Sequence, residues 1–351
     1  MISESFFFGA FIALILFILI LDLGVFSKKN HSIKFGEALA WTAVWISFAL
    51  GFYVLLDNKA EMVHGIETVE QLHAKVAQYK HPIALTGDFQ HDLELYRNNL
   101  SLEYITGYLI EYALSIDNIF VMIVIFSAFG VREKYYKRIL FWGVLGALIM
   151  RFLFIFLGAS LLARFHWVMY VFGGILLFTG FKMLIAKDEE EEIDPSKHPV
   201  VRFFSSFLRV YPRFVGGNFF IKRNRYVYVT PLFIALMVVE FTDVIFAFDS
   251  VPAIFSVTKD PYIVFFSNIF AIMGLRSLFF LLTNIMHLFH YLKYGLGVLM
   301  LFIGVKMMFH EMMLELGFET RHSLYTILGI LLTSIVASLL FPKAKSESVQ
   351  A

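Results

Sequence analysis

The stretch that decides the fold is residues 240–252, Glu240-Phe-Thr-Asp243-Val-Ile-Phe-Ala-Phe-Asp249-Ser-Val-Pro252. It sets three carboxylates inside an apolar run long enough to cross a membrane. An ionised Asp near the centre of a bilayer costs roughly 2.5–3.5 kcal/mol, so several in one span need partners, water or a cation. A similar stretch lies upstream, Glu111-Tyr-Ala-Leu-Ser-Ile-Asp117-Asn118. Together the two stretches predict one shared functional site within the membrane.

The composition is that of a polytopic membrane protein. Of the 351 residues, 59% are hydrophobic, 16% are charged and 42 are Phe, which is too apolar for a soluble chain of this length. The partner of this surface is the lipid bilayer, and a formal net charge of +1 gives no case for nucleic acid. The chain has no Cys, which excludes disulfides, thiolate metal sites and thiol nucleophiles.

Nine apolar runs are long enough to span a hydrocarbon core of about 30 Å. They are residues 6–26, 36–56, 104–129, 138–160, 167–186, 231–256, 262–285, 291–309 and 323–341. The first run follows Met-Ile-Ser-Glu4, which lacks the basic region of a signal peptide, so a retained helix is expected. Basic connections alternate with neutral or acidic ones, and this pattern predicts an N-terminus outside and a C-terminus in the cytoplasm. The predicted class is an all-α polytopic membrane protein.

The spans divide the chain into six parts. These are an N-terminal helix pair (1–57), an extracytoplasmic loop (58–103), a first three-helix repeat (104–186), a cytoplasmic loop (187–230), a second three-helix repeat (231–310), and a C-terminal helix and tail (311–351). The outer loop carries His64, His73, His81 and His91 among acidic residues. A solvated loop that could form short surface helices is expected there, with weak metal collection as the alternative.

An internal repeat relates the two three-helix units. Tyr170-Val-Phe-Gly173-Gly-Ile-Leu-Leu-Phe-Thr-Gly180-Phe-Lys182 recurs as Tyr294-Gly-Leu-Gly297-Val-Leu-Met-Leu-Phe-Ile-Gly304-Val-Lys306, and Arg151 recurs as Arg276. Because each unit has an odd number of crossings, the second unit is expected to be inverted, as in many secondary transporters whose sites lie near the midplane. Lys182 and Lys306 lie near span ends, where snorkelling to the interface is expected.

Two registers of the acidic stretches remain open. One pairs Asp117 with Asp243, and the other pairs Glu111, Asp117 and Asn118 with Asp243, Asp249 and Ser250. Either register brings carboxylates of both units together. On a regular helix Asp249 points about 240° away from Asp243, so a bend is needed to aim both at one ion. Pro252 removes one helical N–H and is expected to unwind the backbone near Asp249.

Carboxylate, amide and hydroxyl oxygens suit Mn²⁺, Ca²⁺ or Mg²⁺ better than Zn²⁺ or Cu⁺. Ser115 and Asn118 share a helix face with Glu111, and Asn268 is a polar group within the seventh span. Arg151 and Arg276 could neutralise two acids in a structural network, which is the alternative to a metal site. Two arginines cannot neutralise five carboxylates, so protons or a cation are still required.

These motifs resemble the TerC family of integral membrane proteins, named for tellurium resistance and including manganese exporters of the Alx type. The resemblance runs from the first span to the ninth and rests on Glu111-x-x-Leu-Ser115-x-Asp117-Asn118, on Glu240-x-x-Asp243-x-x-Phe-Ala-x-Asp249-Ser250-x-Pro252, and on Ser-Asn268-x-Phe-Ala-x-x-Gly-Leu-Arg276. It implies a bacterial inner-membrane protein that exports Mn²⁺. By motif match the metal ligands would be Glu111, Asp117, Asn118, Glu240, Asp243 and Asp249, supported by Ser115, Ser250, Pro252, Asn268, Arg151 and Arg276.

The resulting hypothesis is export of Mn²⁺ as a transported substrate, with protons as the candidate counter-ion and no organic cofactor. The alternatives are a Ca²⁺ or organic-solute exporter and a non-transporting scaffold in metal or tellurite stress. An enzyme is not expected, because no span pairs a nucleophile with a base. The choice between Mn²⁺ and Ca²⁺, the regulatory trigger and the oligomeric state are left open.

Overall fold

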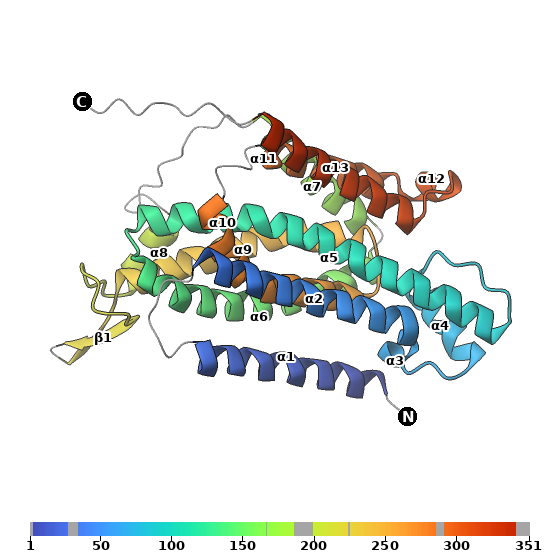
Figure 1. The fold of residues 1–351 in the computed structure, drawn as a ribbon, viewed down its shortest axis with the longest axis horizontal. Coiled ribbons are helices and arrows are strands. Elements are labelled where there is room, and N and C mark those ends of the chain that lie inside the picture. The colour runs from blue at the N-terminus through green and yellow to red at the C-terminus, as the bar shows by residue number, and fades with distance from the viewer. Residues whose placement is uncertain are drawn as a thin grey trace.

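A computed structural model describes residues 3–26, 34–165, 167–185, 199–223, 225–285 and 291–341, and it is almost entirely helical (Figure 1). The long helices are α1 (Glu4–Phe26), α2 (Phe35–Lys59), α5 (Phe89–Ala128), α6 (Tyr136–Arg164), α7 (Val168–Ile185), α9 (Pro231–Phe255), α10 (Pro261–Ile285), α11 (Leu292–Met308) and α13 (Thr320–Leu340). The short elements are α3 (Glu61–His64), α4 (Val69–Tyr79), η1 (Glu133–Tyr135), α8 (Pro199–Phe207), β1 (Phe220–Arg223), β2 (Tyr226–Val229) and α12 (His310–Glu315).

Seven helices are long and apolar enough to cross a membrane, which confirms the all-helical polytopic class. They are α2, α5, α6 with η1, α7, α9, α10 and α13. The two remaining predicted spans coincide with α1, whose apolar part covers Glu4–Ile18, and with α11, which has 17 residues. The count of nine therefore stays a prediction.

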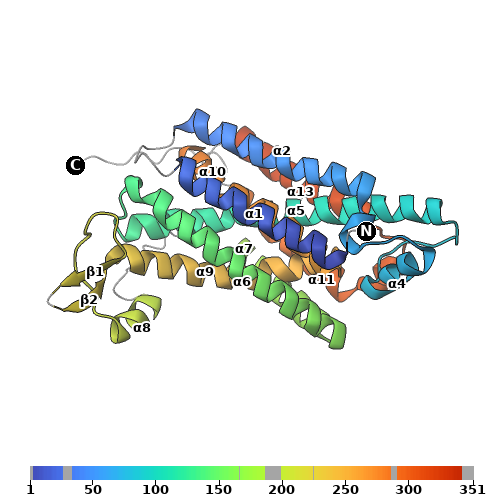
Figure 2. The same cartoon turned by 90° about the horizontal axis from the view of Figure 1, so that it is seen from below.

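The helices run roughly along the long axis of the molecule, with distinct caps at its two ends (Figures 1 and 2). One end carries α3, α4 and the beginning of α5, and we call it the α4 end. The opposite end carries α8 and the antiparallel β1–β2 hairpin, and we call it the hairpin end. Residues 186–198, which include the acidic run of the predicted cytoplasmic loop, lie outside the described residues.

Helix α5 begins earlier than the predicted span at residue 104. The Asp88 side chain accepts hydrogen bonds from the N–H groups of Gln90 and His91, which caps a helix that starts at Phe89. The 40-residue helix then continues without a break to Ala128. The segment predicted as a loop is thus largely helical, with α3, α4 and the first turns of α5 packed together.

Helix α10 is the central helix, and 89% of its most apolar window is buried by protein. It packs against α2, α5 and α6. Near its beginning, Phe266 meets Phe11 of α1 and Phe52 of α2 at ring-centroid distances of 4.5 and 5.2 Å. Asn268 lies two residues beyond Phe266 on α10, and its polar side chain is fully buried by protein.

Helices α7 and α11 make the most extensive contact between two elements, and four glycines line it. A β-carbon at Gly180 would lie 2.8 Å from the carbonyl oxygen of Gly297, and one at Gly173 would lie 3.2 Å from that of Gly304. These pairings are antiparallel, and small residues allow such close backbone approach between membrane helices. Antiparallel packing is what an inverted repeat requires, although the repeat itself stays a prediction.

We expect Gly180→Ala to destabilise the protein by about 1–3 kcal/mol, because its β-carbon would meet backbone atoms of α11 that cannot move aside. The matched control is Gly174→Ala on the same helix, where nothing lies within 4 Å of the added carbon. Thermal unfolding of both purified variants checks the difference. Equal midpoints for the two variants would contradict the close contact.

Candidate functional site

Arg151 on α6 is the centre of a fully buried polar cluster between four helices. Its Nη1 donates hydrogen bonds to Glu111 on α5, to Ser250 Oγ on α9 at 3.2 Å and to Asn268 Oδ1 on α10 at 2.5 Å. Asp243 Oδ1 on α9 lies 3.9 Å from Arg151 Nη2. We call these five residues the Arg151 cluster. It joins one carboxylate from each acidic stretch, so the two stretches do converge.

The charges of the Arg151 cluster do not balance. Glu111 and Asp243 together carry two negative charges when ionised, and Arg151 carries one positive charge, which leaves one negative charge in surplus. Six buried atoms at or beside the cluster have no hydrogen-bond partner among the described residues: Glu111 Oε2, Asp243 Oδ2, Ser115 Oγ, Asn118 Nδ2, Arg151 Nε and Arg151 Nη2. Buried polar atoms without partners are rare and mark places where water or an ion belongs. The cluster therefore has free capacity for a cation, protons or water.

Asp249 belongs to a different place, a cavity of about 240 Å³ between α5, α7, α9 and α11. Thr179 donates a hydrogen bond to Asp249 Oδ1 at 3.1 Å, and Asn118 lines the same cavity. Lys182 and Lys293 also line it. The side chain of Asp117, next to Asn118, lies outside the described residues. The cavity thus offers carboxylate, hydroxyl and amide oxygen beside two cations.

The expected unwinding at Pro252 is wrong. Helix α9 is continuous from Pro231 to Phe255, and Pro252 lies inside it within the last turn. So close to the end of a helix, the missing N–H costs one hydrogen bond and leaves few turns to distort. Because the helix stays regular, Asp243 and Asp249 point in different directions, as the 100° rotation per residue requires.

Glu240 lies one turn before Asp243 and is half-buried against α6. Its carboxylate occupies the space beside Gly146, where a β-carbon would collide with it. The glycine therefore provides room for this side chain. The five predicted ligands whose side chains are described thus divide into three places: Glu111 and Asp243 in the Arg151 cluster, Asn118 and Asp249 at the cavity, and Glu240 beside Gly146.

Among the residues that the structure describes, no three side chains of His, Asp or Glu lie close enough together to hold a metal ion. Arg276 also lies apart from the Arg151 cluster. It is half-buried and within electrostatic reach of Lys137, roughly 20 Å before Arg151 along α6. Metal binding by the six predicted ligands accordingly stays a prediction.

The predicted snorkelling is wrong for Lys306. Lys182 is exposed on α7, but Lys306 on α11 is only 7% exposed. The end of α11 is covered by the segment that follows α9 and by the connection leading to α13, including Ser256, Phe318 and Thr320. The end of α7 at Lys182 is therefore exposed, whereas the end of α11 at Lys306 is enclosed by protein.

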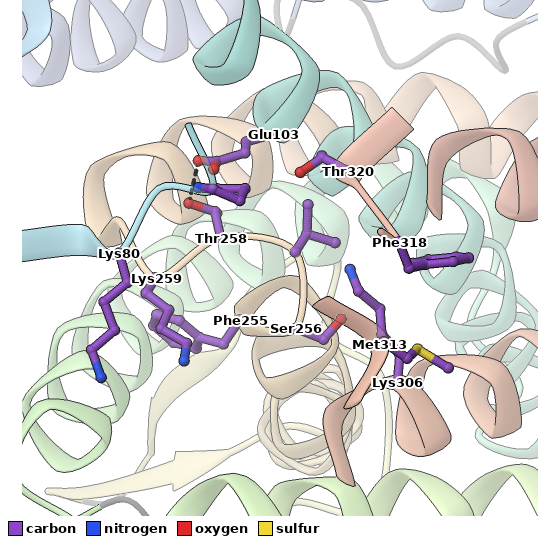
Figure 3. Close-up of a pocket in the computed structure, with 12 residues that line it drawn as sticks. Lys80, Glu103, Phe255, Ser256, Thr258, Lys259, Lys306, Met313, Phe318 and Thr320 are labelled. Atoms are coloured by element: carbon purple, nitrogen blue, oxygen red, sulfur yellow. Dashed lines mark hydrogen bonds between the residues drawn. The ribbon is translucent and has the colours of Figure 1, made fainter. Parts of the chain in front are cut away.

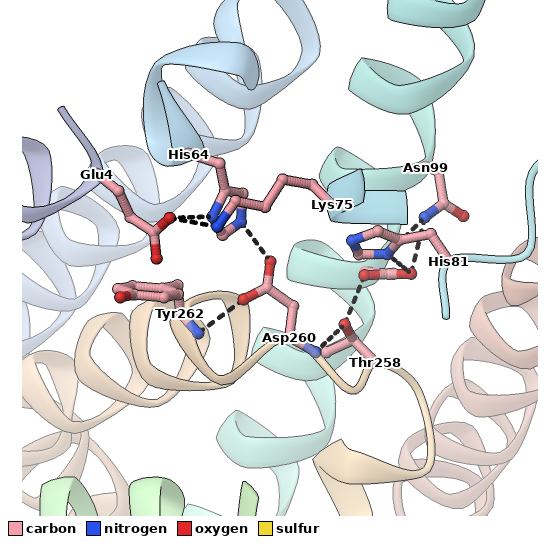
Figure 4. A network of polar contacts seen from close by, with 9 residues as sticks. Glu4, His64, Lys75, His81, Asn99, Thr258, Asp260 and Tyr262 are labelled. Atoms are coloured by element: carbon pink, nitrogen blue, oxygen red, sulfur yellow. Dashed lines mark hydrogen bonds and ion pairs between the residues drawn. The ribbon is translucent and has the colours of Figure 1, made fainter. Parts of the chain in front are cut away.

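Sequence reasoning missed a buried ionic network at the α4 end (Figure 4). His64 Nε2 lies 2.8 Å from Asp260 Oδ2, and both side chains are fully buried. His64 Nδ1 lies 3.5 Å from Glu4 Oε2, which also accepts a hydrogen bond from Lys75 at 2.5 Å. Asp260 accepts the N–H of Tyr262 at 2.9 Å, at the beginning of α10. The network therefore ties α1, α3, α4 and α10 together.

A second part of this network centres on Glu103 of α5. Its carboxylate accepts hydrogen bonds from His81 at 3.0 Å, from Asn99 at 2.7 Å and from Thr258 at 2.5 Å. The Thr258 hydroxyl also accepts the N–H of Asp260, which links the two parts. The only signal in the sequence was the set of histidines in an acidic connection. The solvated-loop prediction is wrong for His64 and His81, which are buried ion partners.

We expect His64 to make the stability of the protein depend on pH. Burial alone lowers the pKa of His64, but Asp260 and Glu4 outweigh this effect and raise the pKa to about 9. The pKa of His64 thus rises from about 6.5 in the unfolded chain to about 9 in the folded protein. The stabilisation that results, of the order of 3 kcal/mol, is complete below about pH 6.5 and is lost as the pH rises through about 9. Thermal unfolding of the purified protein over this interval measures the loss.

The matched variants are His64→Gln and His91→Gln. His64→Gln removes the titrating group and is expected to flatten this part of the pH profile, whereas His91 is exposed on α5 and its variant should keep the wild-type profile. If the His64→Gln protein still lost stability over the same interval, another group would have to carry the pH dependence.

Comparisons with known proteins point to one family of membrane proteins. Residues 96–346 match the family described as integral membrane protein TerC family. A membrane protein of Myxococcus xanthus is 43% identical over 332 residues, which cover 95% of this chain and 91% of the relative. A protein of Escherichia coli K12, named as a candidate membrane-bound redox modulator, Alx, is 38% identical over 301 residues, covering 86% of this chain and 84% of the relative. No solved structure matches the chain.

Proposed function

This chain belongs to the TerC family of integral membrane proteins, and we propose that it exports a divalent metal ion, Mn²⁺, in exchange for protons. The Arg151 cluster is the proposed site at which the ion is bound within the membrane. Tellurite resistance, implied by the resemblance, would be a consequence of this transport for the cell rather than a second reaction.

The observation that carries this proposal is that the Arg151 cluster holds two buried carboxyl groups and only one arginine. Glu111 is fully buried and Asp243 is 4% exposed, and each has one carboxylate oxygen without a hydrogen-bond partner among the described residues. An unneutralised carboxylate inside a membrane protein requires a proton or a cation. A site that alternates between the two is a metal–proton exchanger, because either species satisfies the same oxygens.

The cavity at Asp249 supplies a route to this site. Asn118 lines the cavity and lies seven residues from Glu111 on α5, a separation of about 10 Å along the helix axis. Ser115 lies between them on the same face, and its buried Oγ has no partner among the described residues. Asp249, Asn118 and Ser115 thus form a sequence of oxygen ligands leading toward Glu111 and Asp243, of the type that suits Mn²⁺.

The proposed location is the bacterial inner membrane, with the hairpin end in the cytoplasm. Lys222 and Arg223 lie in β1 at that end, where the positive-inside rule places basic connections. The α4 end would then face outward. Export means that the ion enters from the hairpin end and leaves past the α4-end network.

The rival substrates are Ca²⁺ and small organic solutes. The name of the Escherichia coli relative also suggests redox modulation, but this chain has no Cys and could not act through thiols of its own. A scaffold without transport activity is the rival of another class. Each rival predicts a different result in a flux measurement with purified components.

The deciding experiment is uptake of radiolabelled Mn²⁺ into proteoliposomes with and without an imposed pH gradient, with Ca²⁺ and lysine as competitors. We expect protein-dependent uptake that responds to the gradient and resists both competitors. Equal inhibition by Ca²⁺ would change the assigned substrate, and the complete absence of flux in protein that is folded and inserted would favour the scaffold.

A further inference from the structure

Lys306 is a buried cation inside the helical part of the molecule. The residue is 7% exposed, and no hydrogen bond or ion pair within 4 Å joins it to another described residue. Removing an ammonium group from water is strongly unfavourable unless an opposite charge or hydrogen-bond acceptors compensate it. Its repeat counterpart Lys182 is exposed, so the burial is specific to Lys306.

The ammonium group of Lys306 points into a small cavity at the α4 end (Figure 3). In this view its nitrogen lies between Ser256 and Thr320, while the nitrogen ends of Lys80 and Lys259 point elsewhere. The cavity volume is about 40 Å³. Since roughly 10–15 Å³ of such volume holds one water molecule, the cavity accepts a small ion or a few waters and nothing larger.

Glu103 lines the same cavity but is already engaged elsewhere. Both of its oxygens accept hydrogen bonds from the α4-end network, from His81 and Asn99 on one side and from Thr258 on the other. Burial alone lowers the pKa of His81, but the Glu103 carboxylate raises it above the ordinary value, so His81 serves as the counter-charge of Glu103. Glu103 is within electrostatic reach of the Lys306 ammonium group, but it shares its single negative charge with His81, so no carboxylate is dedicated to Lys306.

The N-terminus of α13 adds positive potential on the same cavity. Thr320 is the first residue of this 21-residue helix, is 7% exposed and lines the cavity. Helix N-termini attract anions, because their first N–H groups lack partners within the helix. Glu319 caps the helix from outside the cavity through the N–H of His322, and Arg321 pairs with Glu319 at 2.6 Å.

We propose that this cavity binds a small monovalent anion such as chloride, held between the Lys306 ammonium group and the first turn of α13 at Thr320. The anion supplies a counter-charge for Lys306 itself, because Glu103, the carboxylate within its electrostatic reach, already serves His81. It also bridges α11 to α13 at the α4 end. The site is separate from the Arg151 cluster and does not depend on metal transport.

The test is thermal unfolding of the purified full-length protein in sodium chloride and in sodium gluconate at equal ionic strength. We expect a saturable upward shift of the unfolding midpoint in chloride for the wild type. The shift should be lost in Lys306→Met and kept in Lys182→Met, which removes the exposed counterpart.

Bromide soaked into crystals of the wild-type protein gives a second measurement that needs no variant. An anomalous peak within hydrogen-bonding distance of Lys306 Nζ is expected. Equal midpoints in the two salts together with an empty cavity would overturn the proposal, as would a chloride shift that survives in Lys306→Met. If Lys306→Met does not fold, the bromide peak decides alone.

Discussion

Asp243→Asn is expected to abolish Mn²⁺ export while leaving the protein at least as stable as the wild type. The substitution removes the negative charge that Arg151 does not neutralise, so the Arg151 cluster becomes balanced and no longer needs a cation. A unit charge near a divalent ion is worth several kcal/mol at an effective dielectric constant of about 20, which corresponds to a loss of roughly 100-fold or more in affinity. Proteoliposome flux and thermal unfolding measure the two effects separately.

The control is the same carboxylate-to-amide exchange at Glu94, an exposed residue of α5. Glu94→Gln should keep the wild-type flux and stability. Full export by the Asp243→Asn protein would remove the Arg151 cluster from the proposed route, and would leave Asp249 and its cavity as the place to test next.

Arg151→Met is expected to have the opposite effect on stability. It would leave the carboxylates of Glu111 and Asp243 buried with no cation beside them, and breaking a buried ion pair in this way costs about 3–5 kcal/mol. The acceptors Ser250 and Asn268 would lose their shared donor as well. We expect a large fall in the unfolding midpoint and in the yield of correctly inserted protein.

Two further variants separate charge from shape. Arg151→Lys keeps the charge but loses the planar guanidinium group, whose Nη1 reaches Glu111, Ser250 and Asn268 and whose Nη2 faces Asp243, so an intermediate loss of stability is expected. Combining Arg151→Met with Glu111→Gln removes one of the two stranded carboxylates and should recover part of the stability lost in Arg151→Met. Additive effects in this double-mutant cycle would show that the two residues are not coupled.

Much of the fold follows from the sequence because membrane helices have a strong signature. Apolar runs of the required length predicted the helices, and the cost of carboxylates in lipid identified Glu111 and Asp243 as residues that must be protected. The structure brings both to Arg151, which the repeat had already marked. Local sequence is sufficient there, because the length of each apolar run and the charge of its side chains can be recognised one helix at a time.

What the sequence could not predict depends on contacts between distant residues. Pro252 predicted a break in α9, but the effect of a proline depends on how near it lies to the end of the helix. Because α9 stays regular, Asp249 faces a cavity that is separate from the Arg151 cluster. His64 and Asp260 are 196 residues apart in the chain, and neither lies in a recognisable motif. Their pairing exists only because the side chain of His64 on α3 reaches Asp260, just before α10, as Figure 4 shows.

The glycine contact between α7 and α11 has a mechanical consequence. Where Gly173 faces Gly304 and Gly180 faces Gly297, backbone meets backbone, and the side chains that would have to move when one helix turns on the other are those that lie against these glycines, among them Leu177, Leu184 and Met308. The contact therefore allows α7 and α11 to rotate relative to each other. Since the sequence contains no thiol, a pair of spin labels attached at cysteines substituted for the exposed Phe178 and Val298 would follow that rotation directly.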